Sequence, residues 1–261
     1  MYERSHWHEN GSPPSTVSTF GTMITIDLKK IDLPSGSRVL DLGCGEGRHG
    51  HALLASRDLH VVALDLDRAA LGKAWEGFQT YFPEHSGPTR SWHVFQGNCL
   101  QLPFKDHSFE GIVCSEVLEH LPDYHSALQE IHRILKPDGL FVLSVPRYWP
   151  ERICWFLSRD YQHDPGGHVR IFKKASLRLE VERLGFKAMA GHGSHALHCP
   201  YWWLKCLNWD RRDHWLPVRL YHRFLLWDMF NAPRPTRCLE KILNPIAGKS
   251  VTLYFDKVVP K

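Results

Sequence analysis

The chain has 261 residues, of which 43% are hydrophobic, so it is long enough to bury a full core within one α/β domain. Its 32 Lys and Arg against 28 Asp and Glu give a formal charge of +4, spread along the chain, which argues against a nucleic-acid-binding protein. Seven Cys, an odd number without paired CxxC spacing, argue against a disulfide framework or a ribbon-type zinc site and favour a reducing cytoplasm. The polar N-terminus carries no apolar signal segment, and no apolar run approaches the roughly 18 to 20 residues of a membrane span, so we expect a soluble, cytoplasmic protein.

The first predicted elements alternate between helices and strands. Residues 16–31 have apolar side chains at helical spacing behind Ser15 and predict a modest amphipathic helix. From Arg38 onward, short β-branched or Leu-rich runs alternate with longer helical patterns, which is typical of βαβ units and a parallel sheet. These runs are RVLDLG, HVVALDLD, HVFQGN, EGIVCSE and GLFVLSVP.

The second half of the chain predicts further elements and two insertions. Residues 124–135 predict a helix that ends at the turn 136–139, residues 173–184 predict another, and residues 186–191 and 250–259 predict two strands. The stretches 147–172 and 199–248 are rich in Trp, Tyr, Arg and Pro and do not fit the alternation. Long structured insertions of this kind are usually lids or binding loops. We therefore expect one domain over 1–261, with a core at 38–146 and lid insertions at about 147–172 and 199–248.

A glycine-rich turn follows the first predicted strand. The segment VLDLGCGEG places Gly43, Gly45 and Gly47 where a strand runs into a helix, and glycines there let the backbone turn tightly and approach a ligand. Asp65 ends the next strand about twenty residues later, where a carboxylate can accept hydrogen bonds from both ribose hydroxyls of an adenosine cofactor. Together the two features indicate a cofactor of nucleoside type.

The motifs DLGCGEG, ALDLD, GNCLQLPF, FEGIVCSEVLEHL and LQEIHRILKPDGLFVLSVP follow one another within residues 38–146. In this order they resemble the class I S-adenosylmethionine (SAM)-dependent methyltransferases, of the small-molecule, methyltransferase type 11-like subgroup. The resemblance implies a Rossmann-like, doubly wound α/β fold with a seven-stranded, mostly parallel sheet, whose last strand is inserted antiparallel. It also implies SAM as cofactor and S-adenosylhomocysteine as product. A nicotinamide-binding Rossmann domain is disfavoured, because its fingerprint is GxGxxG rather than GxGxG.

The resemblance also assigns cofactor-binding residues. Asp65 would hold the ribose, and Leu66 would pack on the adenine. The methionine part of SAM would lie against five residues of the glycine turn, namely Asp41, Gly43, Cys44, Gly45 and Gly47.

Three more residues complete the expected cofactor site. Asn98 and Cys99 match positions that commonly read Asp-Ala in the family, where the Asp accepts from the adenine amino group. Asn98 departs from that pattern, but its side-chain oxygen can still accept the hydrogen bond without the charge. Ser115 follows the fourth strand and matches the segment that meets the amino end of the methionine.

Two residues are candidates for catalysis. His168, in GGHVRIF, is the best general-base candidate, and Glu116 is a base or an orienting group at the substrate side. Methyl transfer is an in-line displacement at a sulfonium, so a base matters only for an acceptor that must lose a proton. The alternative is that His168 and Arg170 brace the lid against the helix that follows.

The second insertion and the segment before it leave alternatives open. The spacing of His192, His195, His198 and Cys199 could bring them to a zinc ion, but a polar loop after a strand is the better interpretation, so we expect no metal. Trp and Tyr residues interleave with Lys and Arg from 202 to 227. They suit a lid over an apolar acceptor, a membrane-surface patch, a dimer interface or plain packing.

The function that we expect is transfer of the SAM methyl group to an O, N or C atom of a small-molecule or lipid-like acceptor. An RNA-modifying methyltransferase is the alternative enzyme, because wobble-uridine enzymes carry similar central motifs. A catalytically silent partner protein with the same fold is the alternative from another class. Nucleic acid ranks low as a partner, peripheral membrane contact stays open, and the sequence does not decide the oligomeric state.

Overall fold

The computed structural model describes residues 24–83, 87–164 and 166–258. In this part of the chain a seven-stranded sheet has the order β3-β2-β1-β4-β5-β7-β6. Strands β1 to β5 are parallel to one another, whereas β7 pairs antiparallel with both β5 and β6. The strands are β1 (Arg38–Leu42), β2 (His60–Asp65), β3 (Ser91–Gln96), β4 (Phe109–Ser115), β5 (Leu135–Pro146), β6 (Phe186–Ser194) and β7 (Ser250–Lys257). The expected Rossmann-like sheet with its inserted antiparallel strand is confirmed.

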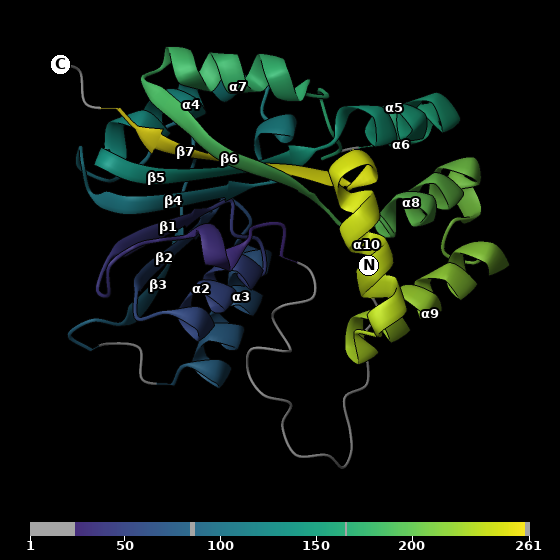
Figure 1. The fold of residues 1–261 in the computed structure, drawn as a ribbon, viewed down its shortest axis with the longest axis horizontal. Helices are drawn as coiled ribbons and strands as arrows, with labels where there is room; N and C mark the ends of the chain where they lie inside the picture. The colour runs from purple at the N-terminus through teal and green to yellow at the C-terminus, as the bar shows by residue number, and fades with distance from the viewer. Residues whose placement is uncertain (1–23, 84–86, 165, 259–261) are drawn as a thin grey trace.

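Helices cover both faces of this sheet (Figure 1). One face packs against α2 (Arg48–Ser56) and α3 (Arg68–Tyr81), and the other against α4 (Tyr124–Ile134) and α7 (Lys174–Arg183). The central strands β4 and β5 are buried almost continuously, because both of their faces are covered. This is why their sequences lack the alternation of apolar and polar residues.

Helix α4 shows how the sequence pattern leads to packing. Leu128, Ile131 and Ile134 lie on one face and are fully buried, as the spacing predicts. Each such side chain contributes about 1.5–3 kcal/mol when it leaves water. The turn expected at 136–139 lies within the bounds of β5 as an irregularity, since Leu135 pairs with Phe109 and the next pair joins Leu140 to Gly111.

The helix predicted for residues 16–31 is wrong in its described part. Residues 16–23 lie outside the described residues, and from Ile24 the chain forms only the 3₁₀ turn η1 (Leu28–Lys30). Polar groups of Thr25 are used by other parts of the fold: its carbonyl accepts from Nε2 of His192 and from Oγ1 of Thr252. These long-range hydrogen bonds hold the backbone around Thr25 across the edge of the sheet. They outweigh the helical preference that the local spacing of apolar residues indicates.

The two insertions form helices at one end of the sheet (Figure 1). Since β5 and β6 run parallel to β1, the segments that follow them both start at the carboxyl edge. The first forms α5 (Tyr148–Leu157) and α6 (Arg159–Gln162), and the second forms α8 (His198–Leu207), η3 (Trp209–Arg211), α9 (Leu216–Asn231) and α10 (Arg234–Ala247). A further 3₁₀ turn, η2 (Leu118–His120), follows β4. Open α/β sheets bind ligands at this carboxyl edge.

Candidate active site

The glycine turn after β1 is shaped by two close approaches. The N–H groups of Gly43 and Cys44 both donate to the carbonyl of Leu64, at 2.8 and 3.0 Å. A Cβ on Gly43 would overlap the side chain of Val117, and the φ of Gly43 is +69°, so only glycine fits. Gly45, with φ +54°, would point a Cβ into open space with no atom within 4 Å. The turn therefore has open space beside Gly45 at the carboxyl edge.

Asp65 joins two of the loops at this edge. Its Oδ2 accepts from the N–H of Gly45 at 2.7 Å, and its Oδ1 accepts from the N–H of Asp67 at 2.9 Å. The side chain is half-buried, and the neighbouring Leu66 is 67% exposed. A carboxylate with lone pairs left for hydroxyl donors thus lies beside the glycine turn, with an apolar side chain next to it.

Asp41 and Cys44 lie beneath the turn. Asp41 is 1% exposed, and its Oδ2 accepts from the N–H of Gly50 in the first turn of α2, at 2.8 Å. Burial raises the pKa of Asp41 to about 7. Cys44 is packed in the core, where burial raises the pKa of its thiol well above the ordinary value. Both side chains thus support the turn from below, and direct contact of either with a cofactor stays a prediction.

Asn98 and Cys99 form a tight turn after β3. The Oδ1 of Asn98 accepts from the N–H of Leu100 at 3.0 Å, and the Asn98 carbonyl accepts from the N–H of Gln101. Cys99 is half-buried and packs against the core. The Asn98 oxygen therefore has a protein donor already and one remaining lone pair for a ligand.

Ser115 and Glu116 follow β4. Ser115 is buried, and its Oγ lies 2.7 Å from Oγ1 of Thr25, so the N-terminal segment holds this hydroxyl. Glu116 has a φ of +56°, which is uncommon for a residue with a Cβ and costs free energy. Its Oε1 accepts from the hydroxyl of Ser144 at 3.1 Å. Backbone strain of this kind is frequently found at functional sites.

His168 is paired with a buried carboxylate. Its Nδ1 lies 2.6 Å from Oε1 of Glu151, which also accepts from the hydroxyl of Tyr161 at 2.7 Å. Burial alone raises the pKa of Glu151, but the hydrogen bond and charge of His168 bring that pKa below its ordinary value. The contact with Glu151 fixes the His168 ring through Nδ1, and the other ring nitrogen, Nε2, takes no part in this contact. Sequence reasoning missed Glu151 and Tyr161, which lie on α5 and α6 with no motif to mark them.

Two more titratable residues adjoin His168. Its ring packs edge-on against that of His120, 5.0 Å between centroids, and the N–H of Val169 donates to the carbonyl of Glu119. Glu119 is fully buried, and neither carboxyl oxygen has a partner among the described residues. Burial and the charge of Glu116 raise the pKa of Glu119 well above its ordinary value, which favours the neutral form of its carboxyl group.

The histidines considered for zinc are separated by the fold. Nε2 of His192 lies 3.0 Å from the carbonyl of Thr25, and the thiol of Cys199 donates to the carbonyl of Ala247. His195 and His198 instead meet Glu240 of α10, with their potential ligand atoms within 4.8 Å of one another. We call these three residues the histidine corner. Burial lowers the pKa of His195 to about 3 and that of His198 to about 4, so both rings are neutral at pH 7.

The aromatic residues of the insertions contact one another between helices. The indole N–H of Trp203 donates to the carbonyl of Pro150, and its ring lies 5.8 Å from that of Trp149. Trp202 lies 6.0 Å from the ring of Tyr161, the partner of Glu151. These contacts connect α8 to α5 and α6, next to His168. Among residues 24–83, 87–164 and 166–258, no helix combines the length and the apolar character needed to cross a bilayer.

Comparisons with known proteins identify the family of this chain. A model of the methyltransferase domain matches residues 25–190, more than half of the chain. Sterol 24-C-methyltransferase erg6 of Aspergillus fumigatus is 28% identical over 237 residues, 86% of this chain and 57% of that protein. A probable SAM-dependent methyltransferase of Mycolicibacterium smegmatis is 32% identical over 153 residues, 59% of this chain and 53% of that protein. The chain thus spans about half the length of these curated relatives.

Solved structures share the fold. YcgJ from Bacillus subtilis superposes with a TM-score of 0.59 at 19% identity, over 93% of this chain and 99% of that one. The [4+2]-cyclase SpnF superposes with a TM-score of 0.56 at 16% identity, over 87% of this chain and 78% of that one. Such similarities show the fold alone, whereas the match to the domain model establishes the family. The chain therefore belongs to the class I SAM-dependent methyltransferases, whose cofactor is SAM.

Proposed function

We propose that this protein transfers the methyl group of SAM to an O, N or C atom of a small-molecule or lipid-like acceptor, and that S-adenosylhomocysteine is released. The observation that carries the proposal is the common location of two groups of residues. The glycine turn with Asp65 and the His168–Glu151 pair both lie at the carboxyl edge of the sheet. The curated relatives include sterol 24-C-methyltransferases, which supports an acceptor of lipid-like character.

The described residues fit the cofactor. The open space above Gly45 can take the methionine part, and the lone pairs that remain on Asp65 can accept from ribose hydroxyls. Leu66 offers an exposed apolar surface to the adenine, and Asn98 keeps one lone pair for the adenine amino group. When bound, SAM supplies an electrophilic methyl group on a positively charged sulfur.

His168 is proposed as the general base for an acceptor that must lose a proton. Nε2 takes the proton of the acceptor hydroxyl while the acceptor oxygen gains the methyl group, so the ring becomes an imidazolium. Glu151 lies 2.6 Å from Nδ1 and stabilises that positive charge, and Tyr161 fixes the carboxylate by its hydrogen bond. In this scheme Glu151 and Tyr161 are positioning residues.

Glu116 is proposed to face the acceptor. Burial and the neighbouring Glu116 raise the pKa of Glu119 well above its ordinary value, so a proton on this pair of residues favours Glu119. The carboxyl group of Glu116 lies next to the hydroxyl of Ser144. A neutral nitrogen or carbon acceptor becomes positively charged when it gains a methyl cation, and a nearby carboxylate stabilises that charge.

We also propose that the chain is one domain in which α5, α6 and α8 to α10 act as a lid. The aromatic contacts of Trp202 and Trp203 support a lid that closes next to His168. Helices α9 and α10 expose apolar side chains beside basic ones, which supports peripheral contact with a membrane surface from the cytoplasm. The exposed apolar side chains include Leu220, Trp227, Phe230, Leu239, Ile242 and Ile246. The cysteines, all free thiols, support a reducing compartment.

The experiment that tests this proposal follows the methyl group. The purified protein is incubated with methyl-labelled SAM and fractionated cell extract, and label is counted in the lipid, small-molecule and RNA pools. We expect label in the lipid or small-molecule pool. Label in RNA would establish the alternative enzyme, and binding of SAM without any transfer would establish a catalytically silent protein.

Two variants test the proposed base with the acceptor found in this way. His168→Gln should lower kcat about 100-fold or more for a hydroxyl acceptor and leave the affinity for S-adenosylhomocysteine unchanged. Glu151→Gln should retain part of the activity, because Nδ1 of His168 keeps a hydrogen-bond partner while the imidazolium loses the carboxylate that stabilises it. An unchanged kcat in His168→Gln would show that His168 only braces the lid.

A further inference from the structure

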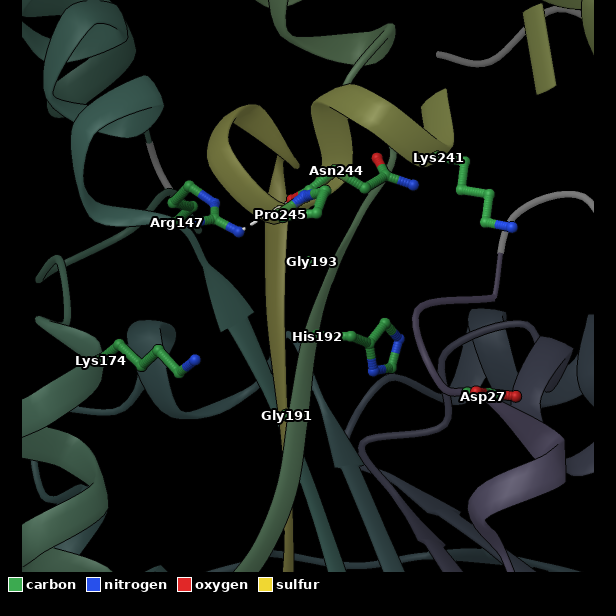
Figure 2. Close-up of a pocket in the computed structure, with 9 residues that line it drawn as sticks. All are labelled: Asp27, Arg147, Lys174, Gly191, His192, Gly193, Lys241, Asn244 and Pro245. Carbon is green, nitrogen blue, oxygen red and sulfur yellow. Dashed lines mark hydrogen bonds between the residues drawn. The ribbon is translucent and has the colours of Figure 1, made fainter. Parts of the chain in front are cut away.

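A cavity of about 530 Å³ lies against the end of the edge strand β6, between α7 and α10 (Figure 2). Among the described residues β6 pairs with β7 alone, and the cavity is lined by residues on both sides of this strand. Figure 2 shows Arg147 and Lys174 on one side of the strand and His192 and Lys241 on the other. Residues assigned to the methyl-transfer site are absent from its lining.

Two glycines of β6 lie near two cations on one face of the strand. Gly191 and Gly193 are alternate residues of a strand, so they face the same side. A Cβ on Gly193 would overlap the guanidinium of Arg147, and one on Gly191 would lie 3.6 Å from Nζ of Lys174. Two positive groups therefore lie over the part of the strand that carries no side chains.

The charges of the cavity are not balanced. Arg147 donates to the carbonyls of Gly248 and Asn244, and within residues 24–83, 87–164 and 166–258 it forms no ion pair; nor do Lys174 and Lys241. The one carboxylate of the lining, Asp27, already accepts from Lys29 and pairs with Lys30 at 3.0 Å. Three cations thus face a cavity without a free counter-charge.

His192 adds a polar atom that lacks a partner. Its Nε2 lies 3.0 Å from the carbonyl of Thr25, and a carbonyl can only accept, so Nε2 carries the hydrogen. Nδ1 is buried and has no hydrogen-bond partner among the described residues. In the neutral ring Nδ1 is an acceptor, which suits a ligand that brings a hydroxyl group as well as negative charge.

We propose that this cavity binds a phosphate group, either of a phosphorylated small molecule or of a phospholipid headgroup. Three cations without counter-charges suit a multiply charged oxyanion, and a guanidinium matches the spacing of phosphate oxygens. The lipid source has support in α10, where Ile242 and Ile246 are 63% and 70% exposed next to Lys241 and Pro245 of the cavity rim. The proposed phosphate site is independent of the proposed methyl transfer.

The test compares charge removal inside and outside the cavity. The variant Lys174→Gln/Lys241→Gln removes two of its cations, and Lys187→Gln is the control, because Lys187 is an exposed residue of the same strand outside the lining. The probes are glycerol 3-phosphate, followed by calorimetry, and phosphatidylglycerol vesicles, followed by co-sedimentation. Affinity for S-adenosylhomocysteine and the melting temperature are measured on each variant to show that the fold and the cofactor site are intact.

We expect the wild type and Lys187→Gln to bind at least one probe and the double variant to bind it at least tenfold more weakly. Binding of glycerol 3-phosphate identifies a soluble phosphorylated ligand. Vesicle binding alone, lost also in Ile242→Ser/Ile246→Ser, identifies a lipid headgroup. Failure of the wild type to bind either probe, or equal weakening in the double variant and the control, overturns the proposal.

Discussion

Replacement of Asp65 by Asn is a sharp test of the cofactor site, because it removes one charge and keeps the shape. The carboxylate accepts two backbone N–H groups through different oxygens, from Gly45 at 2.7 Å and from Asp67 at 2.9 Å. An Asn offers only one oxygen, so one of these donors would face an amide NH₂ group. A hydrogen bond to a charged acceptor contributes about 1.5–3 kcal/mol, so loss of the charge toward the ribose hydroxyls should weaken binding about 10- to 150-fold.

Calorimetry with S-adenosylhomocysteine measures this change directly. Asp67→Asn is the matched control, because it makes the same chemical change two residues away. Asp67 caps α3 by accepting from the N–H groups of Ala69 and Ala70. Asn is also a good helix N-cap, so the control should bind like the wild type. Equal affinity of Asp65→Asn and the wild type would refute the assigned role of Asp65. A folded wild type that binds neither SAM nor its product would refute the cofactor site as a whole.

Four further outcomes follow from described contacts. Asn98→Asp should bind SAM as well as or better than the wild type in calorimetry, because either residue can accept from Leu100 and from an adenine amino group; a large loss of affinity would contradict this. Elemental analysis should find no stoichiometric zinc, and one ion per chain would contradict this and point to the histidine corner or to Glu119, His120 and His168. Trp202→Ala should impair use of the acceptor far more than SAM binding, whereas equal damage to SAM affinity and melting temperature would indicate plain packing. Asp41→Asn should have a larger free energy of unfolding than the wild type at pH 8, as measured by denaturant titration. The difference between the two should vanish as the pH falls from about 7 toward 4. The folded-state pKa of Asp41 is raised from 3.8 to about 7, so the native state binds a proton that the unfolded state releases, and stability falls as pH rises through that window; a pH-independent difference would contradict the assignment.

Local sequence was sufficient to predict the position of those parts of the candidate site that follow strands. The glycine turn and Asp65 could be found because strand ends, positive-φ glycines and a carboxylate recur at fixed spacing along the chain. Residues that act by long-range pairing carry no such spacing. Glu151 meets His168 across 17 positions, and Glu240 meets His195 and His198 from another helix, so only the fold reveals them.

Function was predictable to the level of the family and not beyond it. The fold of this chain also matches a [4+2]-cyclase, so an intact sheet does not by itself establish methyl transfer. The helices proposed as a lid over the acceptor are the inserted ones, where packing and acceptor binding would both use aromatic residues. Trp202 illustrates this, since its contact with Tyr161 suits either role.

The position of β7 between β5 and β6 has a consequence for biosynthesis. β5 and β6 are neighbours along the chain, yet β7 separates them in the sheet. During translation both strands leave the ribosome before β7 and have unpaired edges until it arrives, and such edges pair readily with other chains. Thr25 and Asp27 also lack these partners until β7 is made, because they form hydrogen bonds with Thr252 and Tyr254, 227 positions away. A nascent chain stalled before Ser250 is therefore a target for chaperones and a source of aggregates.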